Sequence, residues 1–276
     1  LVHLTGYLRP LLPTSLKKKL PTRLPSAKNR QLVVHARKML ILEGCVQPVL
    51  QPGINQATAS VLDKLGIQLI YAGTAGCCGA LSHHLSAEEE ALNFARRNIN
   101  AWWPYIQSGA EAIISTASGC GIQLKDYADL LRDDKEYAEK ARKVSELTLD
   151  IAEVLQQEDL SIFEQSESQT IAFHPPCTLQ HGQKLGGVVE KLLRSVGYQL
   201  VPVQDAHLCC GSAGTYSLLQ PKISQRLLEN KLKHLQARQP TLIATANIGC
   251  LEHLQTGTDT RIVHWIELLD GTINLP

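Results

Sequence analysis

The eight cysteines of this chain form two sets of four with nearly identical spacing. Within the 276 residues the second set follows the first at offsets of 132, 132, 132 and 130 residues; the sets are Cys45, Cys77, Cys78 and Cys120, then Cys177, Cys209, Cys210 and Cys250. The surrounding stretches match as well, since LDKLGIQLI corresponds to LLRSVGYQLV and AIISTASGC to LIATANIGC. Such a period indicates an internal duplication. We therefore predict two homologous repeats at 41–158 and 169–276, with an inter-repeat linker at 159–168 and a basic arm at 1–40.

Short apolar, β-rich runs alternate with helical patterns in both repeats. The runs are IQLIYA, EAIISTA, TIAFH, YQLVPV and TLIATA. The segment from Lys135 to Gln157 fits one long helix, unless LTLDIAEVL, which looks like RIVHWIELL of the other half, contains a short strand. The alternation is typical of βαβ units. It predicts an α/β fold of two homologous βαβ-type repeats with parallel sheets and flanking helices.

Two helices have recognisable starts. Ser86 and Glu89 form an S-x-x-E capping box, which predicts a helix beginning at Ser86. Its apolar stripe is Leu92, Ala95, Ile99, Trp102 and Ile106. A second helix is predicted to enter at Pro221, because proline suits the first helical turn. It is expected to bury Ile223, Leu227 or Leu228, Leu232 and Leu235.

The cysteines are placed where parallel sheets bind ligands. Cys45, Cys120, Cys177 and Cys250 each follow a β-run, and each adjacent pair of cysteines follows the next strand of its repeat. The carboxyl ends of parallel strands converge at one edge, where ligands are bound. Each repeat is therefore predicted to gather four thiols at one edge of its sheet.

Three chemistries compete for four gathered thiols. Adjacent cysteines are poor disulfide partners and nothing in these residues suggests export, which disfavours disulfides. Inert buried cysteines would need no shared spacing. Metal ligation explains the pattern, and the lack of a C-x-x-C knuckle favours an iron–sulfur cluster over zinc. Gly79 and Gly211, which follow the pairs, would let backbone amides approach cluster sulfides.

The pattern C-x31-C-C-G, followed after about forty residues by a glycine and a cysteine, resembles the cysteine-rich CCG repeat family. The resemblance covers about residues 41–270. The family includes the cysteine-rich subunit of heterodisulfide reductase and iron–sulfur subunits of hydroxy-acid and glycerol-phosphate oxidising systems. The stretches AGCCGALSHHL, FHPPCTLQHGQ and CCGSAGTYSLLQP look most like the bacterial glycolate oxidase members. In those members a ferredoxin-like region normally precedes the repeats, and this chain contains no C-x-x-C-x-x-C run.

The chain departs from the family pattern at two positions. Ala117 and Asn247 stand where the family often has the first cysteine of a closing C-x-x-C. This departure puts five-thiolate clusters in doubt, whereas four thiolates suffice for a [4Fe-4S] cluster. The resemblance thus implies one or two such clusters, held by the two cysteine sets. His83, His84, His174, His181 and His207 lie near the cysteines and could be ligands, proton carriers, quinone contacts or structural residues.

The resemblance implies an electron-transfer subunit with no catalytic residue of its own. A flavoprotein partner would oxidise glycolate or another 2-hydroxy acid, and this chain would pass single electrons towards a quinone-type acceptor. Two alternatives remain: a thiol/disulfide reductase of the heterodisulfide reductase type, and a non-redox, metal-stabilised assembly subunit. We expect a peripheral position on the cytoplasmic side of the inner membrane, without a transmembrane segment.

The charge of the chain is unevenly distributed. Residues 1–42 contain nine Lys or Arg and no Asp or Glu, although the whole chain has a formal net charge of +1. Such an arm suits an anionic protein or membrane surface. A proline-broken, solvated linker is the other interpretation. The segment contains no nucleic-acid-binding module, and we expect no nucleic-acid partner.

Overall fold

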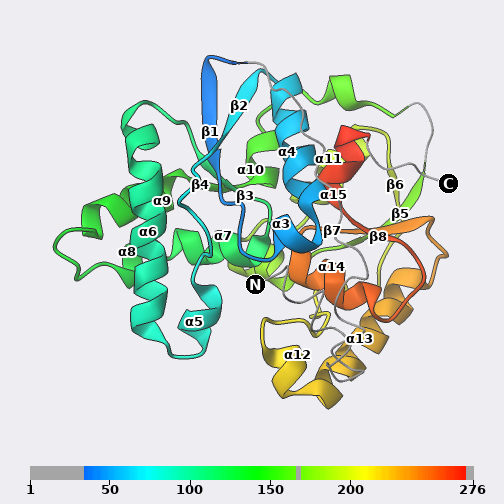
Figure 1. Ribbon diagram of the computed structural model, residues 1–276. Coiled ribbons are helices and arrows are strands. Elements are labelled where there is room, and N and C mark those ends of the chain that lie inside the picture. The colour runs from blue at the N-terminus through cyan, green and yellow to red at the C-terminus, as the bar shows by residue number, and fades with distance from the viewer. Residues whose placement is uncertain (1–33, 166–168, 272–276) are drawn as a thin grey trace, which may run out of the picture.

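The computed structural model describes residues 34–165 and 169–271. The chain folds into two four-stranded sheets, and every strand in each sheet is parallel to its neighbours (Figure 1). Helices flank both sheets, so the predicted α/β class with two βαβ-type repeats is confirmed. The predicted basic arm at 1–40 falls mostly on residues 1–33, which lie outside the described residues.

The first repeat carries the sheet with strand order β2-β1-β3-β4. Its elements are β1 (Arg37–Ile41), α3 (Gln47–Leu50), α4 (Pro52–Lys64), β2 (Ile67–Tyr71), α5 (Ala80–His84), α6 (Glu88–Gln107), β3 (Ile113–Ser115), α7 (Ser118–Lys125), α8 (Tyr127–Leu130), α9 (Ala138–Leu147), β4 (Thr148–Asp150) and α10 (Ile151–Leu155). A 3-10 turn, η2 (Ser161–Phe163), follows them.

The second repeat has the equivalent strand order, β6-β5-β7-β8. Its elements are β5 (Thr170–His174), a π-helical turn η3 (Thr178–Gly182), α11 (Val188–Ser195), β6 (Gln199–Leu200), α12 (Tyr216–Leu219), α13 (Pro221–Gln236), β7 (Leu242–Thr245), α14 (Ile248–Gln255), β8 (Ile262–His264) and α15 (Trp265–Asp270). In both sheets the chain starts in a central strand, adds one neighbour, and then crosses to the other side. The identical order supports the duplication.

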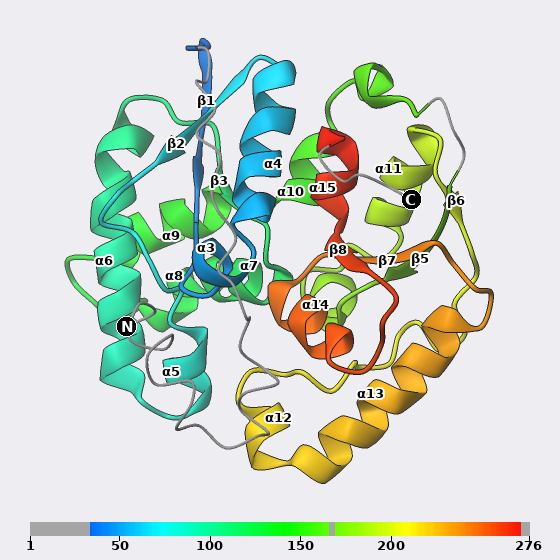
Figure 2. The same cartoon turned by 45° about the vertical axis from the view of Figure 1, so that its right-hand side comes forward.

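The two repeats share a hydrophobic core. Helix α4 of the first repeat packs against α15 of the second, and α10 packs against α11 (Figure 2). One cluster of buried apolar side chains runs through both repeats, from Ile54 and Leu62 of α4 to Trp265 and Ile266 of α15. A second cluster, which contains Trp102, lies within the first repeat. The repeats therefore pack against each other and do not form one separate hydrophobic core each.

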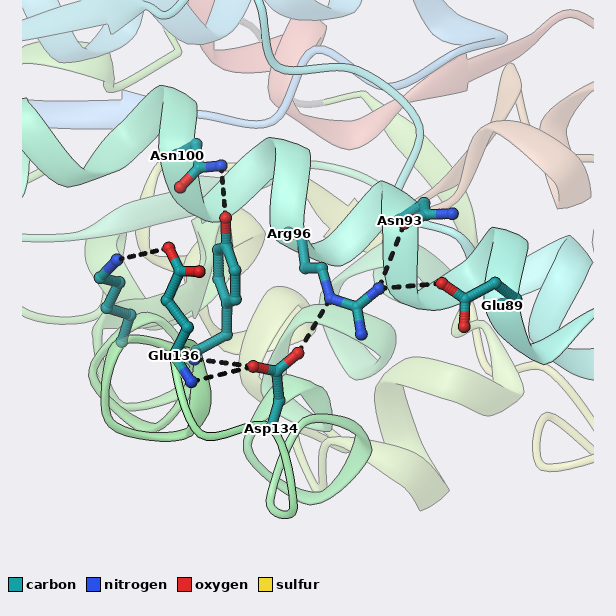
Figure 3. A network of polar contacts seen from close by, with 8 residues as sticks. Glu89, Asn93, Arg96, Asn100, Asp134 and Glu136 are labelled. Carbon is teal, nitrogen blue, oxygen red and sulfur yellow. Dashed lines mark hydrogen bonds and ion pairs between the residues drawn. The ribbon is translucent and has the colours of Figure 1, made fainter.

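The long α6 is fastened to the segment that leads into α9. The Arg96 guanidinium donates to Asp134 at 2.9 Å and to Glu89 at 3.0 Å (Figure 3). Asn100 donates to the Tyr137 hydroxyl at 2.8 Å. These contacts hold the outer face of α6, whose inner face buries Ala95, Ile99 and Trp102 as the sequence predicts.

The predicted capping box at Ser86 is wrong. Helix α6 begins at Glu88 with Ala87 as its N-cap, and Ser86 has a φ of 60°, a left-handed conformation instead of the extended one that a capping serine adopts. Ser86 instead ends the turn after α5, where its amide donates to the His83 carbonyl. The acidic residues at the start of α6 still favour the helix by facing its positive end.

The other helix predictions are largely confirmed. Helix α13 begins at Pro221 and buries Leu228, Leu232 and Leu235. Ile223 is 50% exposed, so its predicted burial is wrong; the first turn of α13 projects beyond the core, which reaches the helix only from Ser224 onwards. A short strand, β4, does interrupt the helical pattern between Lys135 and Gln157.

Strand β1 begins at Arg37, inside the segment predicted as the basic arm. The Arg37 guanidinium forms ion pairs with Glu111 at 3.0 Å and Glu158 at 2.9 Å, so its charge is used within the fold. No helix in the described ranges is both long and apolar enough to cross a membrane.

Candidate metal centre

All eight cysteines lie at the carboxyl edges of the two sheets. Cys45 follows β1, Cys77 and Cys78 follow β2, and Cys120 lies in α7 directly after β3. Because β1 and β3 are neighbours whose chains continue to opposite sides, the edge between them is a topological switch point, where parallel sheets bind ligands. Cys177, Cys209, Cys210 and Cys250 occupy the equivalent places after β5, β6 and β7.

The thiols of each set converge. In the first set the Cys78 and Cys120 sulfurs are 3.4 Å apart, and Cys77 accepts hydrogen bonds from the thiols of Cys45 and Cys78. In the second set the same pairings link Cys177 to Cys209, Cys209 to Cys210, and Cys210 to Cys250. All eight thiols are free, so the fold contains no disulfide. We name the two groups the first and the second thiol set.

Each thiol set resists full ionisation. Hydrogen bonds from Cys45 and Cys78 lower the pKa of Cys77, while its partnership with Cys77 raises the pKa of Cys45 and that with Cys120 raises the pKa of Cys78. The second set follows the same pattern, with the pKa of Cys209 lowered and those of Cys177 and Cys210 raised. One thiolate is stabilised at the expense of its neighbours. Four thiolates at this spacing therefore need positive charge among them, which a bound metal centre supplies.

The glycines after the cysteine pairs set the backbone of each turn. Gly79 has φ 86° and Gly211 has φ 95°, a left-handed conformation that favours glycine. Their amides donate to the sulfurs of Cys77 at 3.4 Å and Cys209 at 3.3 Å. A Cβ at Gly79 would lie 3.1 Å from the Ala91 carbonyl oxygen, and one at Gly211 would lie 2.5 Å from that of Ser224. The turn thus needs glycine both for its φ and for the close approach of the helix behind it.

The helices behind the two turns are equivalent, but they present different residues. The contacts of Gly79 with Ala91 and Phe94 match those of Gly211 with Ser224 and Leu227, an offset of 133 in both cases. By the same offset Asn98 corresponds to Lys231. That Asn98 and Lys231 lie beside the thiol sets was not predicted from the sequence. The offset of 133 residues between the repeats would have paired these two positions.

In the first repeat, Asn98 fastens the turn through the backbone. It accepts from the Gly76 amide at 2.9 Å and donates to the Cys77 carbonyl at 2.8 Å. The Tyr127 hydroxyl donates to the Cys78 carbonyl at 2.9 Å. All these groups are neutral, and Asn98 and Tyr127 are fully buried.

In the second repeat, a buried lysine takes this place. The Lys231 ammonium donates to the carbonyls of Asp205 at 2.8 Å and Ala206 at 3.2 Å, just before Cys209. Lys231 is only 2% exposed, and its charge acts on the sulfurs of Cys209, Cys210 and Cys250. The charge of Lys231 therefore acts on the second thiol set from a buried position, whereas the charge that acts on Cys77 of the first set is that of Arg97.

The histidines near the cysteines divide by burial. His174 is buried, and one of its ring nitrogens lies within 4.8 Å of the Cys210 and Cys250 sulfurs. His83 is part-buried and lies 3.4 Å from Gln123, whereas His84, His181 and His207 are exposed. Of these five histidines, His174 is the one whose ring lies among the thiols of a set.

The two thiol sets are connected across the interface between the repeats. The hydroxyls of Ser118, two residues before Cys120, and Thr178, directly after Cys177, are 2.7 Å apart. The Gln183 amide donates to the Ser118 carbonyl at 3.1 Å and to Asp150 at 3.2 Å. His264 returns a contact to the first repeat, with its Nε2 2.9 Å from the Thr116 carbonyl oxygen. The edges that carry the cysteines are thus fixed relative to each other.

The model of the CCG family, described as a cysteine-rich domain, matches the chain twice, over residues 39–125 and 171–255. The chain belongs to the CCG family. Each match contains one complete thiol set, so the two repeats are two CCG domains that pack against each other.

Several curated proteins resemble these paired CCG domains. The glycolate oxidase iron-sulfur subunit of Escherichia coli K12 is 51% identical over 266 residues, which are 96% of this chain and 65% of that protein. The probable glycolate oxidase iron-sulfur subunit of Bacillus subtilis is 29% identical over 84% of this chain and 54% of that protein. The chain therefore spans about half to two thirds of the length of these two relatives.

Two further comparisons cover most of this chain. Lactate utilization protein A of a Geobacillus species is 27% identical, and the match covers 85% of this chain and 99% of that protein. A crystal structure of a hypothetical protein from Helicobacter pylori superposes with a TM-score of 0.60 at 10% identity, covering 99% of this chain and 57% of that one. At this identity the second match shows a shared fold.

Proposed function

We propose that this chain is the iron–sulfur electron-transfer subunit of a complex that oxidises a 2-hydroxy acid such as glycolate. The observation that supports it best is the pair of converging four-thiol sets at equivalent sheet edges, in a chain 51% identical to a protein named as such a subunit. Thiolates are the ligands that iron–sulfur clusters use, and clusters accept them from several loops.

The donor set fits a [4Fe-4S] cluster in each repeat. Cys45, Cys77, Cys78 and Cys120 would hold one, and Cys177, Cys209, Cys210 and Cys250 the other. Such a cluster, when bound, exchanges single electrons at a potential set by nearby hydrogen bonds and charge. The Gly79 and Gly211 amides supply hydrogen bonds at the sulfur ligands, and Asn98 or Lys231 holds the backbone of the turn.

The chain's role is relay rather than chemistry on the hydroxy acid. A flavoprotein partner would oxidise the substrate, and the two clusters would carry its electrons towards a quinone-type acceptor. The contact between Ser118 and Thr178 would keep the two centres at a fixed separation during this transfer. The complex would lie peripherally on the cytoplasmic side of the inner membrane.

Metal analysis of the full chain tests the assignment. Purified without oxygen, the chain should contain iron and acid-labile sulfide, and reduction should give electron paramagnetic resonance signals of [4Fe-4S] clusters. Zinc in place of iron, or no metal, would instead support the assembly role. Reduction of an added disulfide by the chain without a flavoprotein would support the thiol/disulfide reductase.

Two cysteine variants test whether the sites bind independently. Cys78→Ser should remove about half of the iron, and Cys210→Ser the other half, because each thiol serves one set. Ser82→Ala, a part-buried change four residues after Cys78, is the control and should keep all the iron. Loss of all iron in either cysteine variant would show that the sets share one centre.

The basic arm would dock the chain to its partner or to anionic lipid. Binding of the chain to its docking surface should weaken as salt is added. It should also weaken when Lys17, Lys18 and Lys19 are changed to Gln. Sedimentation with phosphatidylglycerol vesicles and with the flavoprotein distinguishes the two surfaces. Unchanged binding to both would refute a docking role for the arm.

A further inference from the structure

We propose that His174 supplies a nitrogen ligand to the metal centre of the second repeat in place of one of the four thiolates, so that the two centres have different ligand sets. This inference rests on the proposed function, because it requires a metal centre at the second thiol set. It concerns a residue that the thiol pattern does not include.

His174 lies where a metal ligand of this centre is expected. It is the last residue of β5, three residues before Cys177, and it is 1% exposed. One of its ring nitrogens and the sulfurs of Cys210 and Cys250 all lie within 4.8 Å of one another, close enough to share a metal centre. Within the described ranges this is the one such group of three that includes a histidine.

The hydrogen bond of one ring nitrogen of His174 indicates that the other nitrogen is available to bind a metal. Nδ1 lies 2.9 Å from the Thr245 hydroxyl, on the neighbouring strand β7 and in direct register with His174. Nε2 is buried and has no hydrogen-bond partner. If Nδ1 carries the proton and donates it to Thr245, Nε2 presents a lone pair. Histidines that ligate metals commonly donate their second ring N–H to an oxygen in this way.

The fold itself supplies no hydrogen-bond partner for the buried Nε2 nitrogen of His174. A buried polar nitrogen without a partner is costly for the fold, and a metal bond removes that cost.

The first repeat contains no counterpart among its described residues. Leu42 occupies the position equivalent to His174 and is buried in the apolar cluster of that repeat. Ser115, at the place of Thr245, donates instead to the Ala117 carbonyl at 2.9 Å. Asn247, three residues before Cys250, uses its side-chain oxygen to accept from the Gly249 amide and cap α14. His174 is thus the nitrogen donor that distinguishes the second centre.

The test uses the iron-loaded full chain and the nitrogen coupling of its reduced clusters. In electron spin echo spectroscopy, a directly bound imidazole gives a strong nitrogen modulation, which changes when histidine is labelled with ¹⁵N. We expect this modulation in one of the two cluster signals of the unmodified protein. It should vanish in His174→Leu, which copies the first repeat, and persist in His181→Ala, an exposed histidine of the same repeat.

A second substitution keeps the test independent of folding. His174→Cys offers a thiolate at the same place, so the iron content should stay and the nitrogen modulation should disappear. Full iron without a strong, His174-dependent nitrogen modulation overturns this inference and leaves the proposed function intact. An unmodified protein without iron overturns both.

Discussion

At the scale of single residues, the two CCG turns are the most constrained points of the chain. Gly79 and Gly211 combine a left-handed backbone with the close approach of a helix carbonyl. Gly66 shares the backbone conformation, with φ 74°, but a Cβ there would meet nothing within 4 Å. Substitution of Gly66 therefore costs only the strain of a left-handed backbone, whereas substitution of Gly79 or Gly211 also costs a steric overlap.

Alanine substitutions should therefore rank by crowding. Gly66→Ala is expected to lower the free energy of unfolding by about 1–2 kcal/mol, the cost of a left-handed residue with a side chain. Gly211→Ala should lower the free energy of unfolding by about 1–3 kcal/mol more than Gly66→Ala, because its Cβ would overlap the Ser224 carbonyl. The loss for Gly79→Ala should lie between the losses for these two variants. Urea unfolding measures the series, and equal losses at all three glycines would contradict the crowding argument.

Lys231 should set a difference between the two centres. Lys231→Asn copies the first repeat and removes a buried positive charge near the second thiol set. Positive charge favours the reduced, more negative cluster, so the variant should move one of the two reduction potentials downwards. Lys233→Asn, an exposed change two residues along α13, is the matched control. A redox titration that finds the same two potentials in Lys231→Asn and the unmodified protein would rule out this role.

At the scale of elements, the N-termini of α10 and α15 show how the duplication diverged. Asp150 and Glu153 form a capping box at α10, and His264 and Glu267 form one at α15. Each cap also contacts the other repeat, Asp150 through Gln183 and His264 through Thr116. The same element therefore starts a helix and fastens the interface.

The buried cap at Asp150 should make stability depend on pH. Burial raises the pKa of Asp150 from 3.8 to about 7, with Glu153 adding to the rise and Lys125 opposing it. Between these pH values the native state holds a proton that the unfolded chain releases, so the free energy of unfolding falls as pH rises, by about 4 kcal/mol over the window. Above pH 7 this contribution stays constant.

Asp150→Asn should remove this fall while keeping an N-cap oxygen. Relative to the unmodified protein, the variant should gain stability steadily from pH 4 to pH 7. Urea unfolding at each pH gives the difference. A difference that does not change with pH would mean that Asp150 ionises in the folded state as it does in the unfolded chain.

At the scale of the whole molecule, the shared core should make the two repeats unfold together. Trp265 of α15 is fully buried in the cluster that runs through both repeats, against α4. Trp265→Ala should lower stability by about 3–5 kcal/mol. The fluorescence of Trp102 and Trp103, which lie in α6 of the first repeat, should report the shifted midpoint too.

Trp265→Phe, which keeps most of the buried area, should shift the midpoint less. If the Trp102 and Trp103 signal keeps its original midpoint in Trp265→Ala while circular dichroism shows an earlier loss of helix, the repeats unfold independently. The continuous core predicts one coincident transition for both probes.

The sequence by itself determined the duplication, the α/β class and the convergence of four cysteines at one edge of each sheet. These follow from local rules: the period of the cysteines, the alternation of strand and helix patterns, and the meeting of parallel strands at their carboxyl ends. The capping box at Ser86 failed because a left-handed turn after α5 determined where α6 begins.

Only the tertiary structure decided what surrounds each thiol set. Asn98 lies 21 residues after Cys77, and Lys231 lies 22 residues after Cys209. Thr245 contacts His174, which lies 71 residues earlier in the chain. Such partners are chosen by packing between distant elements, which the spacing of the cysteines does not encode. The two sets therefore look alike in the sequence and differ in the side chains beside them once the chain is folded.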